Sequence, residues 1–246
     1  MNLVIDIGNT HTKIAGFEHG RISEIVRIDN KDHSDALTWI TKRAFNKAIY
    51  CSVGGVSLDI INVITSRCPY VIRLDKDTSI PFDVLYKSVE TLGYDRIAAV
   101  SGAYKAFPGE NVLIFDFGTA ITIDFLSAEG EYRGGNISPG LKIRYNSLHD
   151  YTSALPQMEK TEQYLLFGDD TPSAITAGVQ RGVMYEISGY LHDFEQLYPA
   201  CKFVATGGDA AFVASGLKHP VIVNQALVLE GLDYILEYNT TSNEKR

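Results

Sequence analysis

One short Asp-x-Gly motif occurs twice in this chain of 246 residues and constrains what the chain can fold into. It reads Asp6-Ile7-Gly8-Asn9-Thr10 near the N-terminus and Asp116-Phe117-Gly118-Thr119-Ala120 near the middle. Each copy follows an apolar run typical of a buried strand and precedes a second such run. In such a tight turn, the backbone N–H groups and the hydroxyl can donate hydrogen bonds to a phosphate, and the carboxylate can bind the metal ion that accompanies it. Two such turns predict a clamp on a nucleotide.

The same order of elements follows each copy. The first half predicts strands over residues 2–7, 11–17 and 21–28, a helix over 34–45, a strand over 48–53, a helix over 58–66 and a strand over 70–74. A helix over 97–107 follows. The second half predicts strands over 112–117, 119–126, 131–137, 202–205 and 221–223, helical segments between them, a short helix from Asp209 and a final helix from Gln225. Both halves read βββαβαβ, which indicates an internal repeat.

This repeat predicts two α/β domains, each a mixed sheet with helices packed against it, and a ligand cleft between the domains. We expect an N-terminal domain over residues 1–110 and a C-terminal domain over residues 111–246. The length of the chain is sufficient for two such cores.

Composition argues against several classes of protein. The formal net charge of −8 provides no basic field for nucleic acid, so an anionic ligand must be met by local cations. The three cysteines lie far apart without a C-x-x-C pair, which favours reduced thiols over a disulfide framework or a zinc site. No apolar run reaches membrane-spanning length and no signal-peptide region precedes Asp6, so we expect a cytoplasmic protein. The sequence also lacks a P-loop, a G-x-G-x-x-G fingerprint, a kinase H-R-D loop, and zinc-protease and serine-esterase motifs.

Three segments carry candidate chemistry, and each has a plainer alternative. In the first turn, Lys13 adds a cation near the phosphate site, although a hairpin turn with an Asx hydrogen bond has the same pattern. The run Thr206-Gly207-Gly208-Asp209-Ala210 suits a phosphate or a flat ring packed on bare backbone, but Asp209 also suits an N-cap. In Leu92-Gly93-Tyr94-Asp95-Arg96, Asp95 can accept a hydroxyl proton and Arg96 can grip a carboxylate. An N-cap and a solvated charge are the alternatives there.

Five segments in a fixed order resemble one family. They are Asp6-x-Gly8-Asn9-Thr10, Gly93-Tyr94-Asp95-Arg96, Asp116-x-Gly118-Thr119-Ala120, the Gly-Gly-Asn-Ile-Ser-Pro-Gly run over 134–140, and Thr206-Gly207-Gly208-Asp209-Ala210. The ordered set is similar to type III pantothenate kinases, and the resemblance extends from residue 2 to the Leu-Glu-Gly-Leu run over 229–232. It implies an acetate and sugar kinase, heat-shock ATPase and actin-like fold of the ribonuclease H-like type. It also implies transfer of the ATP γ-phosphoryl group to the primary hydroxyl of pantothenate, the first step of coenzyme A biosynthesis.

The resemblance further implies a role for each matching residue, a homodimer, and the ligands ATP, Mg²⁺ and a monovalent cation. Asp95 would be the general base. Pantothenate would contact Tyr86, Gly93, Tyr94, Asp95, Arg96 and, from the partner subunit, Thr171. ATP would contact Asp6, Ile7, Gly8, Asn9, Thr10, His11, Thr12, Lys13, Thr119, Gly207 and Gly208. Asp116 would hold the monovalent cation, K⁺ or NH₄⁺, and Asp6 would hold Mg²⁺.

The helix that starts at Pro172 carries Ala174, Gly178 and Gly182 at four-residue spacing. Such a smooth ridge allows another helix to approach closely, either inside the second domain or from another subunit. The resemblance makes this helix the candidate dimer surface. Two positions depart from the family pattern: Asp170 stands where Asn is usual, and Ser153 where Ala is commoner.

Two other functions remain open at this point. The first is a regulatory protein of the same fold that binds nucleotide without catalysis, against which the joint presence of Asp6, Asp95, Arg96 and Asp116 argues. The second is a small-molecule kinase with another hydroxy-acid substrate. Arg96 with Tyr86 favours a substrate that bears a carboxylate and a hydroxyl, and these residues alone do not distinguish pantothenate from other such acids.

Overall fold

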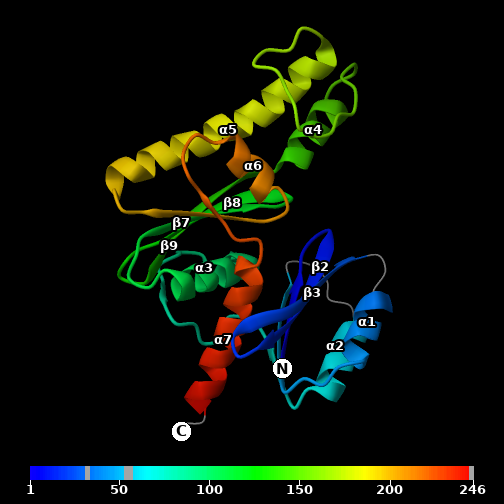
Figure 1. Ribbon diagram of the computed structural model, residues 1–246, viewed down its shortest axis with the longest axis vertical. Helices are drawn as coiled ribbons and strands as arrows, with labels where there is room; N and C mark the ends of the chain where they lie inside the picture. The colour runs from blue at the N-terminus through cyan, green and yellow to red at the C-terminus, as the bar shows by residue number, and fades with distance from the viewer. Residues whose placement is uncertain (31–33, 53–57, 244–246) are drawn as a thin grey trace. The chain divides into compact units, whose positions relative to one another are not determined.

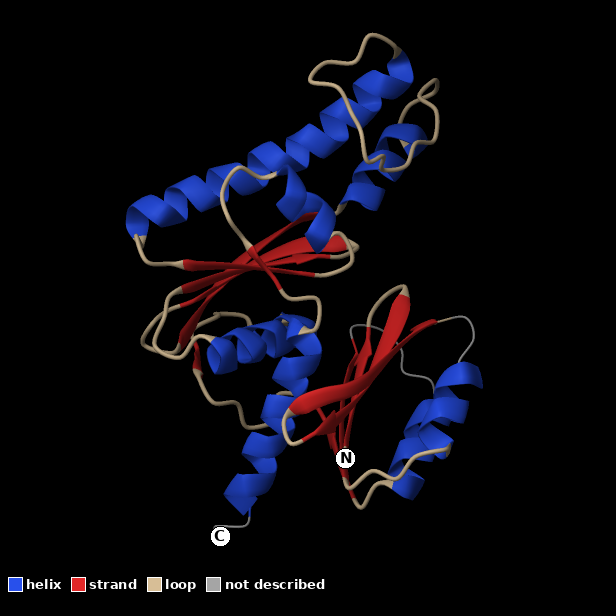
Figure 2. Cartoon of the chain, in the orientation of Figure 1, coloured by secondary structure: helices blue, strands red, loops and turns tan. Residues whose placement is uncertain are grey.

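The computed structural model describes residues 1–30, 34–52 and 58–243. Contacts divide the chain into two compact units (Figures 1 and 2). Unit 1 comprises residues 1–109, 126–134 and 226–246, and unit 2 comprises residues 110–125 and 135–225. The division into domains at residues 110 and 111 stays a prediction.

A five-stranded sheet lies in unit 1. Its strands are β1 (Asn2–Ile7), β2 (His11–Glu18), β3 (Arg21–Asp29), β4 (Lys47–Ser52) and β5 (Tyr70–Arg73), in the order β3-β2-β1-β4-β5. The first three strands form an antiparallel meander, and β4 and β5 continue the sheet parallel to β1. The central strand β1 therefore has an antiparallel neighbour on one side and a parallel neighbour on the other.

The second sheet repeats this order. Its strands are β7 (Val112–Phe117), β8 (Ala120–Leu126), β9 (Glu131–Pro139), β10 (Lys202–Thr206) and β11 (Ile222–Val223), with β6 (Asp83–Val84) added beside β9. The order is β11-β10-β7-β8-β9-β6, and β10 is parallel to both β7 and β11. Without β6, this is the order of the first sheet read from its other edge. The predicted duplication is confirmed.

One face of the first sheet packs against α1 (Ser34–Thr41) and α2 (Leu58–Arg67). Alternate residues of β1 contribute to this core because successive strand side chains point to opposite faces. The core residues include Leu3, Ile5, Ile7, Ile14, Trp39, Ile40, Ile60 and Ile64. The predicted extension of α1 to Phe45 is wrong. The chain leaves the helix after Thr41, and Phe45 turns back into the core, where its ring lies 5.8 Å from that of Trp39.

The other side of β1 carries a polar connection to α7 (Leu227–Asn243). Asn2 Nδ2 donates to Asp233 at 3.0 Å and to Glu237 at 2.8 Å. From β4, Lys47 donates to Glu237 and to Thr240. These bonds fix α7 against the two central strands of the sheet.

Helix α7 also packs closely on α3 (Tyr94–Ala106). Two glycines allow their backbones to approach: a Cβ at Gly102 would meet the carbonyl oxygen of Leu227, and one at Gly231 would meet that of Ala98. Helix α3 is buried along most of its length, from Arg96 to Ala103. The helix that carries the Asp95-Arg96 pair is therefore held in a fixed position within unit 1.

In unit 2, α4 (Leu141–Asp150), α5 (Thr171–Leu197) and α6 (Ala210–Gly216) lie on the same side of β7 and β8 (Figure 1). The core between sheet and helices is strongly aromatic and aliphatic. It includes Phe115, Phe117, Ile121, Ile123, Tyr145, Val179, Val183, Ile187, Leu191 and Phe203.

Several element boundaries differ from the prediction. Helix α3 begins at Tyr94 instead of Ile97, because Gly93 is its N-cap and Asp95 and Arg96 form part of its first turn. Helix α7 begins at Leu227 instead of Gln225. Strand β6 and a short 3₁₀ turn over Val89–Thr91 have no counterpart in the prediction.

All three cysteines are buried and none forms a disulfide bond, as their spacing predicts. Across residues 1–30, 34–52 and 58–243, the structure has no helix long and apolar enough to cross a membrane.

We predict opposite effects on stability for two helical Gly→Ala substitutions. Gly231→Ala should destabilise the protein by about 1–3 kcal/mol, because the added methyl group forces α7 away from α3. Gly189→Ala, at an exposed site of α5 with open space around its Cβ position, should stabilise it by about 0.5–1 kcal/mol. Denaturant unfolding midpoints measure both. Equal effects from the two variants would contradict the close α3–α7 packing.

Candidate active site

The first Asp-x-Gly turn lies at the end of the central strand of unit 1. Asp6 pairs in register with Lys13 on β2 and with Cys51 on β4, and the Gly8 amide closes the turn by donating to the His11 carbonyl at 3.1 Å. At the tip, Asn9 is exposed and available to a ligand. Thr10 is exposed as well, whereas Ile7 is buried and can offer only its backbone.

Asn30, directly after β3, holds this turn, and no sequence motif predicts its role. Its Nδ2 donates to the Gly8 carbonyl at 2.7 Å, and its Oδ1 accepts from the Thr12 hydroxyl at 2.8 Å. The Asn30 backbone amide donates to the Thr10 carbonyl at 3.3 Å. Thr12 is fully buried, so its hydroxyl fixes the turn from inside. The turn is therefore preorganised by a polar side chain 22 residues away.

The half-buried Asp6 carboxyl lies among charged and polar neighbours. Burial raises its pKa, the charge of Lys13 and the hydrogen bond from Cys51 lower it, and the negative charge of Asp95 raises it, with a net rise. The Cys51 Sγ donates to Asp6 Oδ1 at 3.4 Å. Burial raises the pKa of the Cys51 thiol well above its usual value, and the charges of Asp6 and Asp95 add to this effect, so the thiol stays a donor. Asp6 and Asp95 are close enough to interact electrostatically within unit 1.

The N-terminal turn of α3 presents Asp95 and Arg96. Asp95 is not the N-cap; its Oδ1 accepts from the Arg96 amide at 2.9 Å, and the N-cap is Gly93. A side chain at Gly93 would collide with this carboxylate, so only glycine lets it fold back over the helix start. Tyr94 is half-buried at the first helical position.

Arg96 is buried and lies over two tyrosine rings. Its Cζ is 5.5 Å from the ring centroid of Tyr86 and 6.0 Å from that of Tyr132. Only 5% of Arg96 is exposed, so the alternative interpretation of Arg96 as a solvated surface charge is wrong. Tyr86 was predicted from the sequence and Tyr132 was not, because Tyr132 lies 46 positions away from Tyr86 and is brought near it only by sheet pairing.

The second Asp-x-Gly turn, in unit 2, is one residue shorter than the first. The Gly118 amide donates to the Ala120 carbonyl at 3.1 Å, two residues on, whereas the Gly8 amide donates to His11, three residues on, and Thr119 is exposed at the tip. The Thr119 carbonyl accepts from the Gly140 amide at 3.0 Å. This bond joins the turn to the start of α4.

The glycine pair after β10 lies directly beside Asp116. Thr206 is in register with Asp116, and the chain then turns at Gly207 with φ +92°. A Cβ at Gly207 would meet the Asp116 carboxylate, so this glycine is required both by its backbone conformation and by the close approach. Gly208 is exposed with open space around it. Asp209 makes no N-cap bond with its side chain; it forms an ion pair with Lys160.

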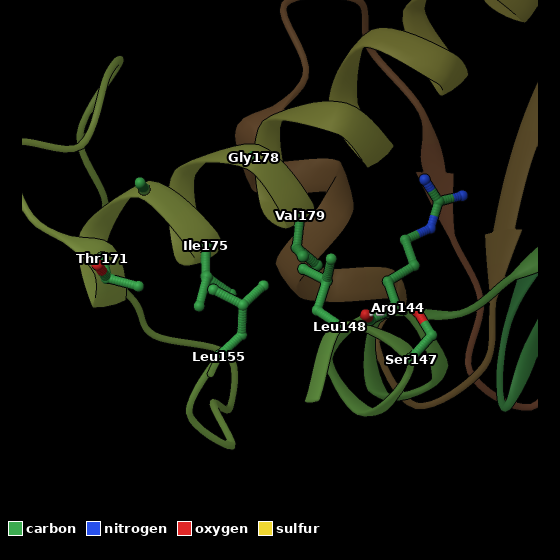
Figure 3. Close-up of a pocket in the computed structure, with 9 residues that line it drawn as sticks. Arg144, Ser147, Leu148, Leu155, Thr171, Ile175, Gly178 and Val179 are labelled. Atoms are coloured by element: carbon green, nitrogen blue, oxygen red, sulfur yellow. Dashed lines mark hydrogen bonds between the residues drawn. The ribbon is translucent and has the colours of Figure 1, made fainter. Parts of the chain in front are cut away.

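Thr171, at the start of α5, lines a pocket of about 600 Å³ within unit 2 (Figure 3). The walls are α4 and α5, with Leu155 from the intervening loop and Arg144 at one end. Asp170 caps α5: the Ser173 amide donates to Asp170 Oδ1 at 2.8 Å, and hydrogen bonds from Ser173 lower the pKa of Asp170. Since Asn and Asp are equally good N-caps, Asp170 in place of the family's usual Asn preserves the start of α5.

The structure thus assembles two groups of selected residues. Unit 1 contains the turn over Asp6–Lys13 together with Asp95, Arg96 and Tyr86, and unit 2 contains Asp116, Thr119 and Gly207–Gly208. In the described part of the chain, no three His, Cys, Asp or Glu side chains gather as a metal site. Asp6 nevertheless fits Mg²⁺, which takes one or two carboxylates and completes its shell with phosphate oxygens and water. Asp116, beside the bare backbone of Gly207, fits a monovalent cation held by carboxylate and carbonyl oxygens.

Solved structures define the class to which this fold belongs. A protein from Campylobacter jejuni described as a Baf family transcriptional activator aligns with a TM-score of 0.66 at 24% identity, over 97% of this chain and 99% of that one. A ROK family glucokinase from Streptomyces griseus, solved with glucose and AMPPNP, aligns with a TM-score of 0.51 at 13% identity, over 96% and 98%. The chain has the mixed α/β fold of the actin-like ATPases and sugar kinases.

Sequence relatives define the family within this class. A profile of type III pantothenate kinases matches residues 2–193. The type III pantothenate kinase of Bacteroides fragilis (strain YCH46) is 40% identical over 239 residues, which cover 97% of this chain and 98% of that protein. The chain belongs to the type III pantothenate kinase family.

Proposed function

We propose that this protein transfers the γ-phosphoryl group of ATP to the primary hydroxyl of pantothenate, giving 4′-phosphopantothenate for coenzyme A biosynthesis. The observation that carries the proposal is the grouping of Asp6, Asp95 and Arg96 within unit 1 of a chain of this family. This group combines a turn that can bind phosphate, a carboxylate that can act as a base and a guanidinium that can bind a carboxylate.

Asp95 acts as the general base in this proposal. Its carboxylate accepts the proton of the acceptor hydroxyl as the oxygen attacks the γ-phosphorus and the bond to the ADP oxygen breaks. Arg96 binds the pantothenate carboxylate, and Tyr86, Gly93 and Tyr94 complete the contact surface. The hydrogen bond from the Arg96 amide to Asp95 Oδ1 orients the base. A positioned base contributes about 10²–10⁴-fold, so alignment and charge neutralisation supply most of the acceleration.

The two turns bind the nucleotide in this proposal. The backbone over Asp6–Lys13 and the Lys13 ammonium contact the phosphates, and Thr119, Gly207 and Gly208 also contact ATP. Asp6 would hold Mg²⁺, and Asp116 the monovalent cation, K⁺ or NH₄⁺. Bound there, the two ions would supply positive charge beside the phosphates in a protein whose net charge is −8.

We further propose a cytoplasmic homodimer in which Thr171 reaches the pantothenate site of the partner subunit. The ridge on α5 supports this arrangement, because Ala174 and Gly178 are exposed. Among the residues that the structure describes, nothing lies within 4 Å of a Cβ built at Gly178 or Gly182. At Gly178 and Gly182 the ridge therefore leaves room for a second helix. The three buried, unpaired thiols suit a reducing compartment.

The direct test is ATP-dependent phosphorylation of pantothenate, measured with potassium and then with sodium in its place. We expect turnover with potassium and a higher KM for ATP with sodium, because the proposed cation site at Asp116 lies beside the nucleotide. Absence of turnover in both buffers contradicts the kinase proposal. Equal kinetics in both contradicts the cation site alone.

We expect Asp95→Asn to lower kcat by about 10²–10⁴-fold, because the amide cannot accept the hydroxyl proton. The KM for ATP should change far less, since Asp95 acts on the acceptor. Asp77→Asn is the matched control: that side chain is 77% exposed, and its replacement should leave kcat unchanged. Full turnover by Asp95→Asn would refute its role as the base.

We expect a dimer in sedimentation experiments at micromolar concentration. Gly178→Lys should shift the protein to monomer and lower its activity, because the bulky charge covers the ridge and removes the partner's Thr171. Gly189→Lys, also at an exposed glycine of α5, is the control and should remain dimeric. A wild-type protein that is only monomeric would contradict both the dimer and the role of Thr171.

A further inference from the structure

A fully buried tyrosine that the proposed reaction does not use lies beneath the substrate-binding residues. Tyr132, on β9, has 0% of its surface exposed. Its ring is stacked on that of Tyr86, with centroids 6.3 Å apart and planes 8° from parallel. The Arg96 guanidinium carbon lies within about 6 Å of both centroids, at 5.5 and 6.0 Å, the range of a cation–π contact.

The backbone around Tyr132 also fixes the position of Tyr86. Val84 of β6 pairs in register with Tyr132, and the Leu85 amide donates to the Tyr132 carbonyl at 2.9 Å. Tyr86 is the next residue of that segment. Two positions beyond Tyr132, Gly134 has φ +101°, and a Cβ there would lie 3.0 Å from Tyr86 Cδ2. The segment of β9 over 132–134 is thus shaped to receive the Tyr86 ring.

We propose that Tyr132 is a positioning residue for the substrate carboxylate: it acts through Arg96 and Tyr86, holding the guanidinium and the ring in the orientation in which they meet pantothenate. The inference rests on the proposed function, in which Arg96 binds that carboxylate. Tyr132 itself does not reach the ligand, because it is fully buried.

The physical need for such a residue follows from the chemistry of arginine. A guanidinium binds a carboxylate through two parallel hydrogen bonds only when its plane is correctly oriented. Arg96 is buried, so solvent cannot stabilise its charge or set its orientation. The two tyrosine rings supply a favourable electrostatic contact to the guanidinium and restrict the orientations of its plane. Part of the entropy cost of ordering the side chain is then met before the substrate binds.

A purely structural role predicts different behaviour. If Tyr132 only filled space, its loss would lower stability and affect both substrates alike. If it orients Arg96, loss of the ring raises the KM for pantothenate alone. The aromatic ring, not the hydroxyl, is the group that this role requires.

The test compares Tyr132→Phe and Tyr132→Leu in the full-length protein. We expect Tyr132→Leu to raise the KM for pantothenate by roughly two- to thirtyfold, the range of a cation–π contact, with the KM for ATP unchanged. Tyr132→Phe keeps the ring and should leave the KM for pantothenate unchanged. If Tyr132→Leu fails to fold, Tyr132→Met removes the ring with a side chain that fills irregular gaps.

Tyr104→Leu is the matched control. Tyr104 lies on α3 like Arg96, but its ring is 5.8 Å from that of Phe82 and 6.4 Å from that of Tyr234. Its replacement should lower stability without raising the KM for pantothenate. An equal rise in this control, an unchanged KM for pantothenate in Tyr132→Leu, or an equal rise of that KM in Tyr132→Phe and Tyr132→Leu would each overturn the inference.

A second measurement separates this inference from the proposed function. Absence of pantothenate phosphorylation by the wild type contradicts the proposed function, and the contact between Tyr132 and Arg96 is then tested by unfolding midpoints alone. In a double-mutant cycle of Tyr132→Leu and Arg96→Met, we expect the double variant to lower the unfolding midpoint by less than the sum of the two single variants, because both changes remove the same contact. Additive shifts would show that Tyr132 does not act through Arg96.

Discussion

The positions of the site residues depend on how the central strand of each sheet is paired: it has one antiparallel and one parallel neighbour. The antiparallel neighbour makes a tight turn follow the strand directly, and the parallel neighbour brings the end of another strand to the same edge. Asp6 and Asp116 each stand one residue before the end of such a strand. The first therefore meets Lys13 and Cys51, and the second meets the glycine turn after Thr206. The chemistry of both turns follows from this pairing.

A second constraint places the acceptor-binding residues. Helix α3 carries Asp95 and Arg96 on its first turn, and its backbone is held against α7 at Gly102 and Gly231. Arg96 in turn lies over the stacked rings of Tyr86 and Tyr132. A base needs correct geometry before a favourable pKa, so rigid packing of this helix matters more than the identity of any one surface contact.

The sequence was sufficient to predict the duplicated order of elements, because apolar strands bounded by Asp-x-Gly turns are a local signal. It also indicated Asp6, Asp95, Arg96 and Asp116, whose motifs lie within a few residues. It could not show that Asn30 bonds to Gly8 or that Cys51 bonds to Asp6, since these contacts join segments 22 and 45 residues apart through sheet register. Tyr132 was missed for the same reason. The early end of α1 depends on burial of Phe45, which local helix propensity does not encode.

The most direct test of the account is a crystal structure of the protein with pantothenate and a non-hydrolysable ATP analogue. We expect both carboxylate oxygens of pantothenate to lie on the Arg96 guanidinium and its primary hydroxyl to lie about 2.6–3.2 Å from the Asp95 carboxylate, the reach of a general base. A complex in which the hydroxyl lies away from Asp95, with the carboxylate bound by other residues, would contradict it.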